Sequence, residues 1–261
     1  MAIHPSSIIA EGAIIPTSCT VGPFCTIGSN VTLGEDCEII SHVVLDGHTK
    51  IGDRVRIFPF ASVGIAPQDL KYKGEPTACV IGDDTVIRES VTISRGTEGG
   101  GGITKVGSGC LIMAYTHIGH DSQIGSHCIL ANGTTLAGHV TIEDYVVTSA
   151  MGPVHQYCTI GQYAYIGGGT TITQDVLPYS LTSIERNNHA YGINKVGLER
   201  KGFTAEEIKQ LRAAYRILQH SKLNTTEAVA AIREKIASGE FGEKVAYLAD
   251  FIAKSDRGVI K

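Results

Sequence analysis

The sequence predicts a mainly β protein, a parallel β-helix of hexapeptide repeats followed by a small α-helical C-terminal domain. Three observations support this prediction. Large aliphatic residues recur every six positions as far as Ile172, small residues recur at a second fixed position, and helical spacing begins near residue 190. Hexapeptide repeats are a recognised β-helix signal. With 31 glycines and no tryptophan, the core must be built from small and β-branched side chains.

The aliphatic repeat runs through residues 3–63, resumes in phase over 81–93, and continues over 106–172 with its phase shifted by one. Four residues after each aliphatic comes a small or β-branched residue, such as Cys25 or Thr116. Residues two apart on a strand point the same way, so each hexad should form one short strand with two inward residues. Glycine often follows the aliphatic, where we expect a bend. A generic all-β sandwich is the alternative fold.

All seven cysteines occupy the small inward position of a hexad, where we expect them to behave as buried apolar residues. Cys19 and Cys37, like Cys110 and Cys128, are spaced as neighbours in a stack, so a disulfide is conceivable. The odd count favours reduced thiols instead. No spacing suggests a zinc cage, and we expect no metal and no cofactor.

The net charge of −4 argues against a nucleic-acid partner, which ordinarily requires a basic face. We find no apolar run long enough to span a bilayer and no charged-then-apolar leader. We therefore expect a cytoplasmic protein without stable membrane insertion.

Two segments interrupt the repeat, residues 64–78 and 94–105, and both should be loops ejected from the coil. Loops on a rigid scaffold commonly carry function, although the glycine tract of the second could equally be floppy. Both carry cations: Lys71, Lys73, Arg95 and Lys105.

We expect the repeat domain to cover residues 1–189 and a helical domain to cover 190–261. Thr204 and Glu207 have the spacing of a capping box at the start of a helix. Two further segments with apolar spacings of three and four follow it. These helices should cover the end of the solenoid, whose last coil would otherwise expose unpaired edges.

Histidines concentrate in three hexads, which begin at Ile118, Leu136 and Val154, eighteen positions apart. If three hexads make one coil, these hexads stack. A lone exposed histidine is ordinarily a solvated surface residue, but convergence on one edge indicates a site. His127 does not share this face and is expected to be structural. The residues that should point outward together are His117, His120, Asp121, Gly138, His139, His155 and Gln156.

This group suggests general-base catalysis. A neutral imidazole accepts a proton near pH 7 because its ordinary pKa is ~6.5. His120 is the expected base, and the adjacent Asp121 would fix its tautomer. No serine or cysteine stands out as a nucleophile, which favours direct attack by an acceptor hydroxyl. The backbone N–H of Gly138 is the natural donor to an oxyanion.

Further motifs accompany the hexads: "QDLKYKGEPT" (68–77), "IRESVTISRGT" (87–97), "HIGHD" (117–121), "LAGHV" (136–140), "VHQY" (154–157), "GINKVGLERKGF" (192–203) and "SDRG" (255–258). With the hexads, they resemble the UDP-N-acetylglucosamine O-acyltransferases of lipid A biosynthesis. The resemblance implies a left-handed β-helix with 18-residue coils. It also implies transfer of an (R)-3-hydroxyacyl group from acyl carrier protein to the sugar 3-hydroxyl of UDP-N-acetylglucosamine, in a homotrimer with sites between subunits.

The resemblance also implies roles for individual residues. His120 corresponds to the general base, Asp121 to its partner and Gly138 to the oxyanion donor. A position corresponding to Gly168 sets acyl length, and a glycine there implies a long chain of about fourteen carbons. The implied substrate contacts are Asp69, His139 and Gln156 to the sugar, Lys71, His117 and His155 in the active site, and Asn194 and Arg200 to the nucleotide.

Two departures from the family pattern affect the nucleotide site. Val196 stands where a glutamate is common, and the segment around residues 183–190 is longer than usual. Three rival functions stay open: an acyltransferase with an amine acceptor, a trimeric zinc carbonic anhydrase using His117, His120 and His139, and an inactive scaffold.

Overall fold

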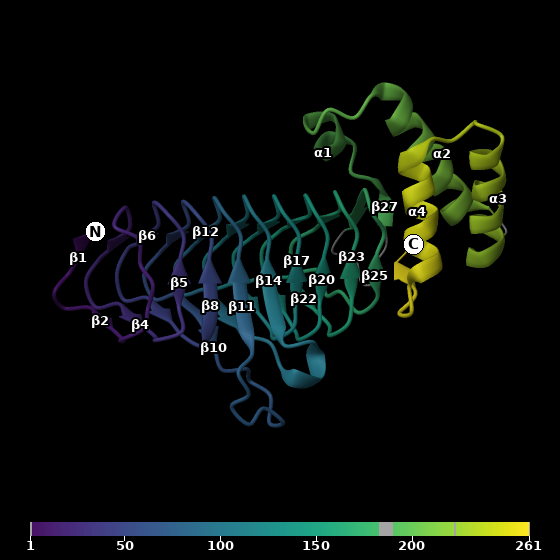
Figure 1. Cartoon of the computed structure of the whole chain (residues 1–261). Helices are drawn as coiled ribbons and strands as arrows, with labels where there is room; N and C mark the ends of the chain where they lie inside the picture. The colour runs from purple at the N-terminus through teal and green to yellow at the C-terminus, as the bar shows by residue number, and fades with distance from the viewer. Residues whose placement is uncertain (1, 183–189, 222, 261) are drawn as a thin grey trace.

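The computed structural model describes residues 2–182, 190–221 and 223–260. It is a left-handed parallel β-helix with α-helices at its C-terminal end, as the sequence predicts (Figure 1). Three parallel sheets form the faces of the prism, and the chain visits them in the order A, B, C in each coil.

Sheet A has eleven strands: β1 (Ala2–Ile3), β3 (Thr20–Val21), β6 (Glu38–Ile39), β9 (Arg56–Ile57), β12 (Val86–Ile87), β15 (Leu111–Ile112), β18 (Ile129–Leu130), β21 (Val147–Thr148), β24 (Tyr165–Ile166), β26 (Ser180–Thr182) and β27 (Ala190–Ile193). Sheet B has eight: β2 (Ile8–Ile9), β4 (Thr26–Ile27), β7 (Val44–Leu45), β10 (Ser62–Ile65), β13 (Thr92–Ser94), β16 (His117–Ile118), β19 (Thr135–Leu136) and β22 (Pro153–Val154). Sheet C has nine: β5 (Thr32–Leu33), β8 (His48–Ile51), β11 (Ala78–Ile81), β14 (Ile103–Val106), β17 (Gln123–Ile124), β20 (Thr141–Ile142), β23 (Thr159–Ile160), β25 (Asp175–Val176) and β28 (Val259–Ile260).

The register gives the coil size and explains the phase of the repeat. Ile118 pairs with Leu136, and Leu136 with Val154, so residues eighteen positions apart are vertical neighbours. At the first loop Ile51 pairs with Ile81, thirty positions on, which adds two whole hexads and leaves the phase unchanged. At the second loop Ile81 pairs with Val106, twenty-five positions on, which adds seven residues and shifts the phase by one.

The corners of the prism differ from the sequence-based expectation. The left-handed backbone lies three residues after the inward aliphatic, and non-glycine residues such as Asp121 (φ 62°) and His139 (φ 62°) adopt it. The glycine directly after the aliphatic serves close approach instead of a bend. A Cβ on Gly119, for example, would lie 2.7 Å from the carbonyl carbon of Ala137 in the next coil. Stacked coils leave no room for a side chain there.

Two apolar cores follow from this arrangement. The solenoid core consists of the inward aliphatics with the small residues, including all seven cysteines, which are buried free thiols. Burial raises the pKa of the Cys79 thiol to about 12, so it stays protonated and unreactive. The second core joins the last coil to the helices, where Leu177 and Tyr179 pack with residues such as Leu211 and Phe241.

The chain leaves the solenoid through β27, which pairs antiparallel with β26, and then forms α1 (Lys195–Arg200), α2 (Ala205–His220), α3 (Thr225–Ala237) and α4 (Glu243–Lys254). Thr204 and Glu207 form the expected capping box at α2. The chain then returns, and β28 pairs with β25 at the end of sheet C. Among the described residues, no helix is long and apolar enough to cross a membrane.

Candidate active site

The clustered histidines lie where sheet B turns into sheet C, an edge we call the B–C corner (residues 119–122, 137–140 and 155–158). The 18-residue register stacks positions 120, 138 and 156 in one column and positions 121, 139 and 157 in the next. Both ejected loops leave the solenoid at the same edge, because each joins a strand of sheet B to a strand of sheet C.

His120 and Asp121 form the central pair. Nδ1 of His120 lies 2.8 Å from Oδ2 of Asp121. The His120 side chain is 18% exposed, whereas that of Asp121 is fully buried. Asp121 lies outside the solenoid core, but the second loop covers it, so it is not open to solvent. A buried carboxylate needs hydrogen-bond donors, and the second loop provides them.

The second loop folds onto Asp121. The Thr97 N–H donates to Oδ1 at 2.8 Å, and the Thr97 hydroxyl donates to Oδ2 at 2.6 Å. The short 3₁₀ helix η1 (Glu98–Gly100) places Gly100 so close that a Cβ there would lie 2.1 Å from the carboxylate carbon. The glycine tract thus lies against the carboxylate. Asp121 donates its own N–H to the Thr104 hydroxyl at 2.7 Å.

Gly138 makes room for the His120 imidazole. A Cβ at position 138 would lie 2.6 Å from Cε1 of His120 and 2.7 Å from Nε2. In the described part of the chain, the N–H groups of Gly138 and His120 donate to no other group. An unpaired backbone N–H beside an imidazole is a natural hydrogen-bond donor to a negatively charged oxygen.

His139 packs against the central pair. Its ring meets the His120 ring edge-on, with centroids 5.0 Å apart, and its Nε2 lies 4.0 Å from Asp121 Oδ2. Its other face stacks on Tyr157 at 4.5 Å and 9°. His117 lies below, with Nδ1 2.8 Å from the Thr92 hydroxyl. Burial, and to a smaller extent His120, lowers the pKa of His117, which favours its neutral form.

The remaining expected residues of this edge are more exposed. His155 and Gln156 are exposed, and the His155 ring contacts the Gln156 carbonyl at 3.1 Å. Asp69 and Lys71 belong to the first loop, which leaves the corner two coils before His120; Asp69 accepts the Lys71 N–H at 2.9 Å.

Three expected residues lie at other edges of the same chain. Asn194 reaches the edge between sheets C and A (the C–A corner, residues 125–128, 143–146 and 161–164): its amide donates to the Tyr163 carbonyl at 3.1 Å, and its carbonyl caps α1. Arg200 is exposed in the last turn of α1. Gly168 follows β24 at the edge between sheets A and B, the A–B corner. One chain therefore does not gather all the expected residues.

The two departures noted in the sequence have different outcomes. Val196 is exposed on the first turn of α1. Residues 183–189 of the longer segment lie outside the described residues.

A metal is a weak fit to the imidazoles. His120, Asp121 and His139 could offer ligand atoms within 4.8 Å of one another. However, Asp121 already receives hydrogen bonds from Thr97 and faces Nδ1 of His120. These contacts use three of the roughly four acceptor positions of the carboxylate, which leaves little room for a cation. His117 of the proposed zinc trio faces Thr92 instead.

Sequence reasoning missed several residues that shape this site. Thr92, Thr97, Thr104 and Gly100 are ordinary loop or strand residues in the sequence, and contacts between coils or with the loop reveal their importance. A usable signal for Thr97 was its place in a loop that leaves the solenoid one coil before the histidines.

Comparisons with known proteins agree with this architecture. A family model described as UDP N-acetylglucosamine O-acyltransferase, domain 2, matches residues 175–260, and a bacterial transferase hexapeptide model matches residues 103–138. The solved UDP-N-acetylglucosamine acyltransferase of Francisella novicida is 41% identical, with a TM-score of 0.94, over 99% of this chain and 93% of that chain. The O-acyltransferase of Moraxella catarrhalis is 39% identical, with a TM-score of 0.94, over 100% of both chains. The Arabidopsis acyltransferase is 37% identical, with a TM-score of 0.88, over 99% of this chain and 100% of that chain. The chain therefore belongs to the UDP-N-acetylglucosamine O-acyltransferase family of hexapeptide-repeat enzymes.

Proposed function

We propose that this acyltransferase moves an (R)-3-hydroxyacyl group from acyl carrier protein to the 3-hydroxyl of UDP-N-acetylglucosamine, the first step of lipid A biosynthesis. The observation that carries the proposal is the His120–Asp121–Thr97 arrangement at an accessible corner, beside the unpaired N–H of Gly138. The related solved enzymes are named for the same sugar nucleotide.

In the first step, His120 acts as a general base. Its Nδ1 faces Asp121, which leaves Nε2 to take the proton from the sugar hydroxyl as its oxygen attacks the thioester carbonyl. Asp121 holds the tautomer in which Nδ1 carries the hydrogen and stabilises the imidazolium that forms. Thr97 fixes the carboxylate through both oxygens, so the imidazole keeps one orientation.

In the second step, the tetrahedral intermediate collapses. The Gly138 N–H donates to the oxyanion while it exists. The C–S bond then breaks, and the imidazolium returns its proton to the departing thiolate of the carrier protein, which restores neutral His120. No acyl-enzyme forms in this scheme, consistent with the seven cysteines being buried in the solenoid core.

The substrates are assigned to residues on more than one edge. At the B–C corner the proposed contacts are Asp69, Lys71, His117, His139, His155 and Gln156. Of the residues proposed for the nucleotide, Asn194 lies at the C–A corner and Arg200 lies in the last turn of α1. We therefore propose a homotrimer in which each site combines the B–C corner of one subunit with elements of a neighbour.

Gly168 is proposed to set the acyl length. A Cβ at this position would meet its nearest neighbours at 3.5 and 3.6 Å, which is ordinary contact, so a larger side chain can be introduced without a backbone clash. Gly168→Met should therefore shift donor preference toward shorter chains, measured by competition among acyl carrier proteins of different chain length. An unchanged preference among acyl chain lengths would reject the proposal that position 168 sets the acyl length.

The reaction itself is tested by product analysis. Purified enzyme is given 3-hydroxyacyl carrier proteins of several lengths with UDP-N-acetylglucosamine or its 3-amino analogue, and products are identified by mass spectrometry. We expect a base-labile ester on the hydroxyl sugar. Selective formation of a base-stable amide on the amino sugar would assign the amine-acceptor reaction instead.

Subunit sharing is tested by mixing two inactive variants. His120→Ala and Arg200→Ala trimers are dissociated together and reassembled. If each site takes these residues from different chains, roughly a quarter of the sites regain both. If the reassembled mixture is no more active than the separate variants, His120 and Arg200 of the same chain serve the same site.

A further inference from the structure

A column of stacked side chains links the C-terminal segment to the catalytic corner. Asp121, His139 and Tyr157 occupy the same corner position in successive coils, each with left-handed backbone. His139 is held between two rings: it lies edge-on to His120 and stacks face-to-face on Tyr157. Its position against the base therefore depends on the tyrosine ring.

Arg257 covers the other end of this column. Its guanidinium carbon lies 5.9 Å from the centroid of the Tyr157 ring, and its Nη2 donates to the Gln156 carbonyl at 2.8 Å. The guanidinium makes a cation–π contact and a directed hydrogen bond at the same time, a combination that the point charge of a lysine reproduces poorly. Arg257 thus holds the turn that carries Tyr157.

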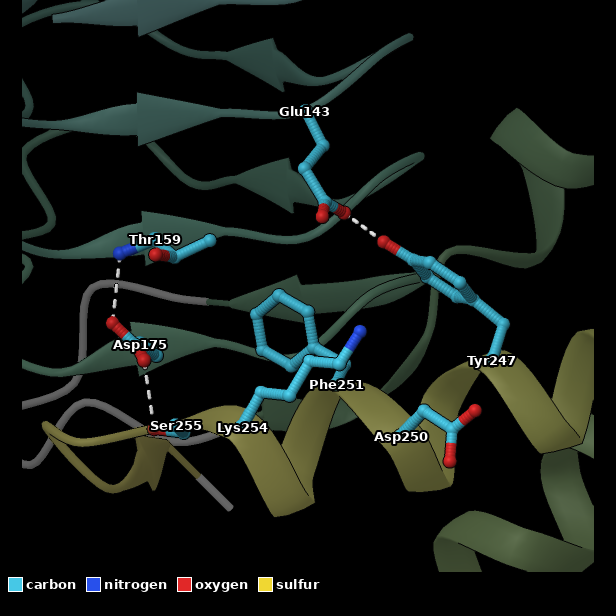
Figure 2. Close-up of a pocket in the computed structure, with 8 residues that line it drawn as sticks. All are labelled: Glu143, Thr159, Asp175, Tyr247, Asp250, Phe251, Lys254 and Ser255. Carbon is cyan, nitrogen blue, oxygen red and sulfur yellow. Dashed lines mark hydrogen bonds between the residues drawn. The ribbon is translucent and has the colours of Figure 1, made fainter.

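The segment that carries Arg257 is itself fixed to the last coil. Asp175, which is buried, accepts the Thr159 N–H at 2.7 Å and the Ser255 hydroxyl at 2.7 Å, in the hollow between α4 and sheet C (Figure 2). The Asp175 N–H donates to the Gly258 carbonyl at 2.9 Å. Arg257 is therefore presented to the corner from a segment bonded on both sides.

We propose that Tyr157 and Arg257 are positioning residues for acyl transfer: Arg257 fixes Tyr157, and Tyr157 fixes the His139 ring against His120. This inference rests on the proposed function. It explains why the chain returns from the helices to the solenoid next to the active corner. It also gives the C-terminal segment a part in catalysis without contact with the reacting atoms.

The C–A corner provides a control of the same construction. There His127 stacks on Tyr145 at 5.0 Å and 15°, and the ammonium of Lys201 lies 4.5 Å from the Tyr145 ring centroid. This column repeats the histidine, tyrosine and cation of the B–C corner at an edge to which the proposed mechanism assigns no proton transfer. Tyr145→Leu removes the stack on His127, together with the stack of Tyr145 on Tyr163 at 4.8 Å and 8°, and reports what stacking alone contributes to stability.

The test compares Tyr157→Leu, Tyr157→Phe, Arg257→Ala and Arg257→Lys with Tyr145→Leu in the full-length enzyme. We expect Tyr157→Leu to lower kcat/KM roughly tenfold, because small displacements of catalytic groups are costly. KM should rise for the sugar nucleotide and stay constant for the acyl donor, since the proposed role of His139 is contact with the sugar. Tyr157→Phe should keep wild-type kinetics. Arg257→Ala should lower kcat/KM about threefold, and Arg257→Lys should recover little of that loss.

A spectroscopic readout separates positioning from general loosening. In protein labelled at histidine, the His139 ring resonances should shift when Tyr157 becomes Leu, shift less in Arg257→Ala, and stay in place in Tyr157→Phe and Tyr145→Leu. If Tyr157→Leu keeps both the resonance and the kinetics of the wild type, the inference is wrong. If Tyr157→Leu does not fold, Arg257→Ala, a substitution at a half-buried residue outside both apolar cores, decides on the same readouts.

His120→Ala, assayed in parallel, reports on the proposed function alone. If His120→Ala is inactive while the Tyr157 and Arg257 variants keep wild-type kinetics, the positioning roles of Tyr157 and Arg257 are wrong and the proposed reaction is unaffected. Active His120→Ala would overturn the reaction and the positioning inference with it.

Discussion

The B–C and C–A corners of the solenoid are built alike and differ in what surrounds the imidazole. His139 and His127 occupy the same place in their hexads, both have left-handed backbone, and both stack on a tyrosine one coil above. At the B–C corner, a buried carboxylate and a second imidazole lie against the stack. The stacked column is thus a scaffold feature, and the chemistry comes from additions to it.

The main difference between the two corners is that position 138 is a glycine. At the C–A corner, Ser126 accepts the Ser108 N–H at 3.2 Å, and Asp144 accepts the Ser126 N–H at 2.7 Å, so each coil caps the one below it. At the B–C corner, Gly138 has no side chain to offer, and the His120 ring fills the space. The same hexad position therefore carries a capping side chain at the C–A corner (Ser126) and leaves space for the His120 ring at the B–C corner (Gly138).

The largest expected effect comes from closing that space. Gly138→Ala should lower kcat on the order of 10³-fold, because the new methyl displaces the His120 ring and disturbs the proposed oxyanion donor together. Ser126→Ala, the equivalent position of the other corner, is the control and should keep its turnover. Steady-state assays measure both variants, with light scattering to check that each keeps the wild-type oligomeric state. An active Gly138→Ala would show that the space beside the His120 ring is dispensable.

Asp121→Asn should come next, with kcat lowered roughly 10²-fold, because an amide fails to stabilise the imidazolium and favours the wrong tautomer. Asp144→Asn is the matched change at the C–A corner, where the retained oxygen still accepts the Ser126 N–H. If Asp121→Asn and Asp144→Asn are equally active, the carboxylate of the B–C corner has no special part in the reaction.

Thr97→Val should lower kcat about tenfold, because it removes the hydroxyl that binds Oδ2 while keeping the backbone donor to Oδ1. Thr97→Ser restores a hydroxyl and should recover most of the activity. If the valine and serine variants behave alike, the effect belongs to loop packing and not to the hydrogen bond.

The smallest effect concerns stability against pH. The folded protein lowers the pKa of His117, so the unfolded chain binds more protons as the pH falls below ~6.5. The contribution of neutral His117 to the free energy of unfolding is complete above that pH. It is lost as the pH falls from there toward the lowered pKa of the folded protein. His117→Gln should therefore flatten the loss of unfolding free energy between neutral and mildly acidic pH, followed by denaturant titration. The exposed His127→Gln serves as control, and parallel pH profiles for His117→Gln and wild type would contradict the expectation.

Most of the fold was predictable because one inward aliphatic every six residues leaves a single consistent register. The same spacing is enough to stack positions 120, 138 and 156 from the sequence alone. Burial of Asp121 was not predictable, because the covering loop belongs to an earlier coil and its glycine tract has no periodicity. The part played by Asn194 in capping α1, and the contact of Arg257 with the Gln156 turn, depend on where the helical segment docks. A hexad pattern does not encode that docking.

The central claim is that acyl transfer uses the His120 imidazole of the B–C corner and not the His127 imidazole of the C–A corner. The direct measurement is the turnover of His120→Ala beside His127→Ala, with both variants in the oligomeric state of the wild type. We predict a loss of roughly 10² to 10⁴ for His120→Ala and near wild-type turnover for His127→Ala. Comparable turnover in the two variants would contradict the account.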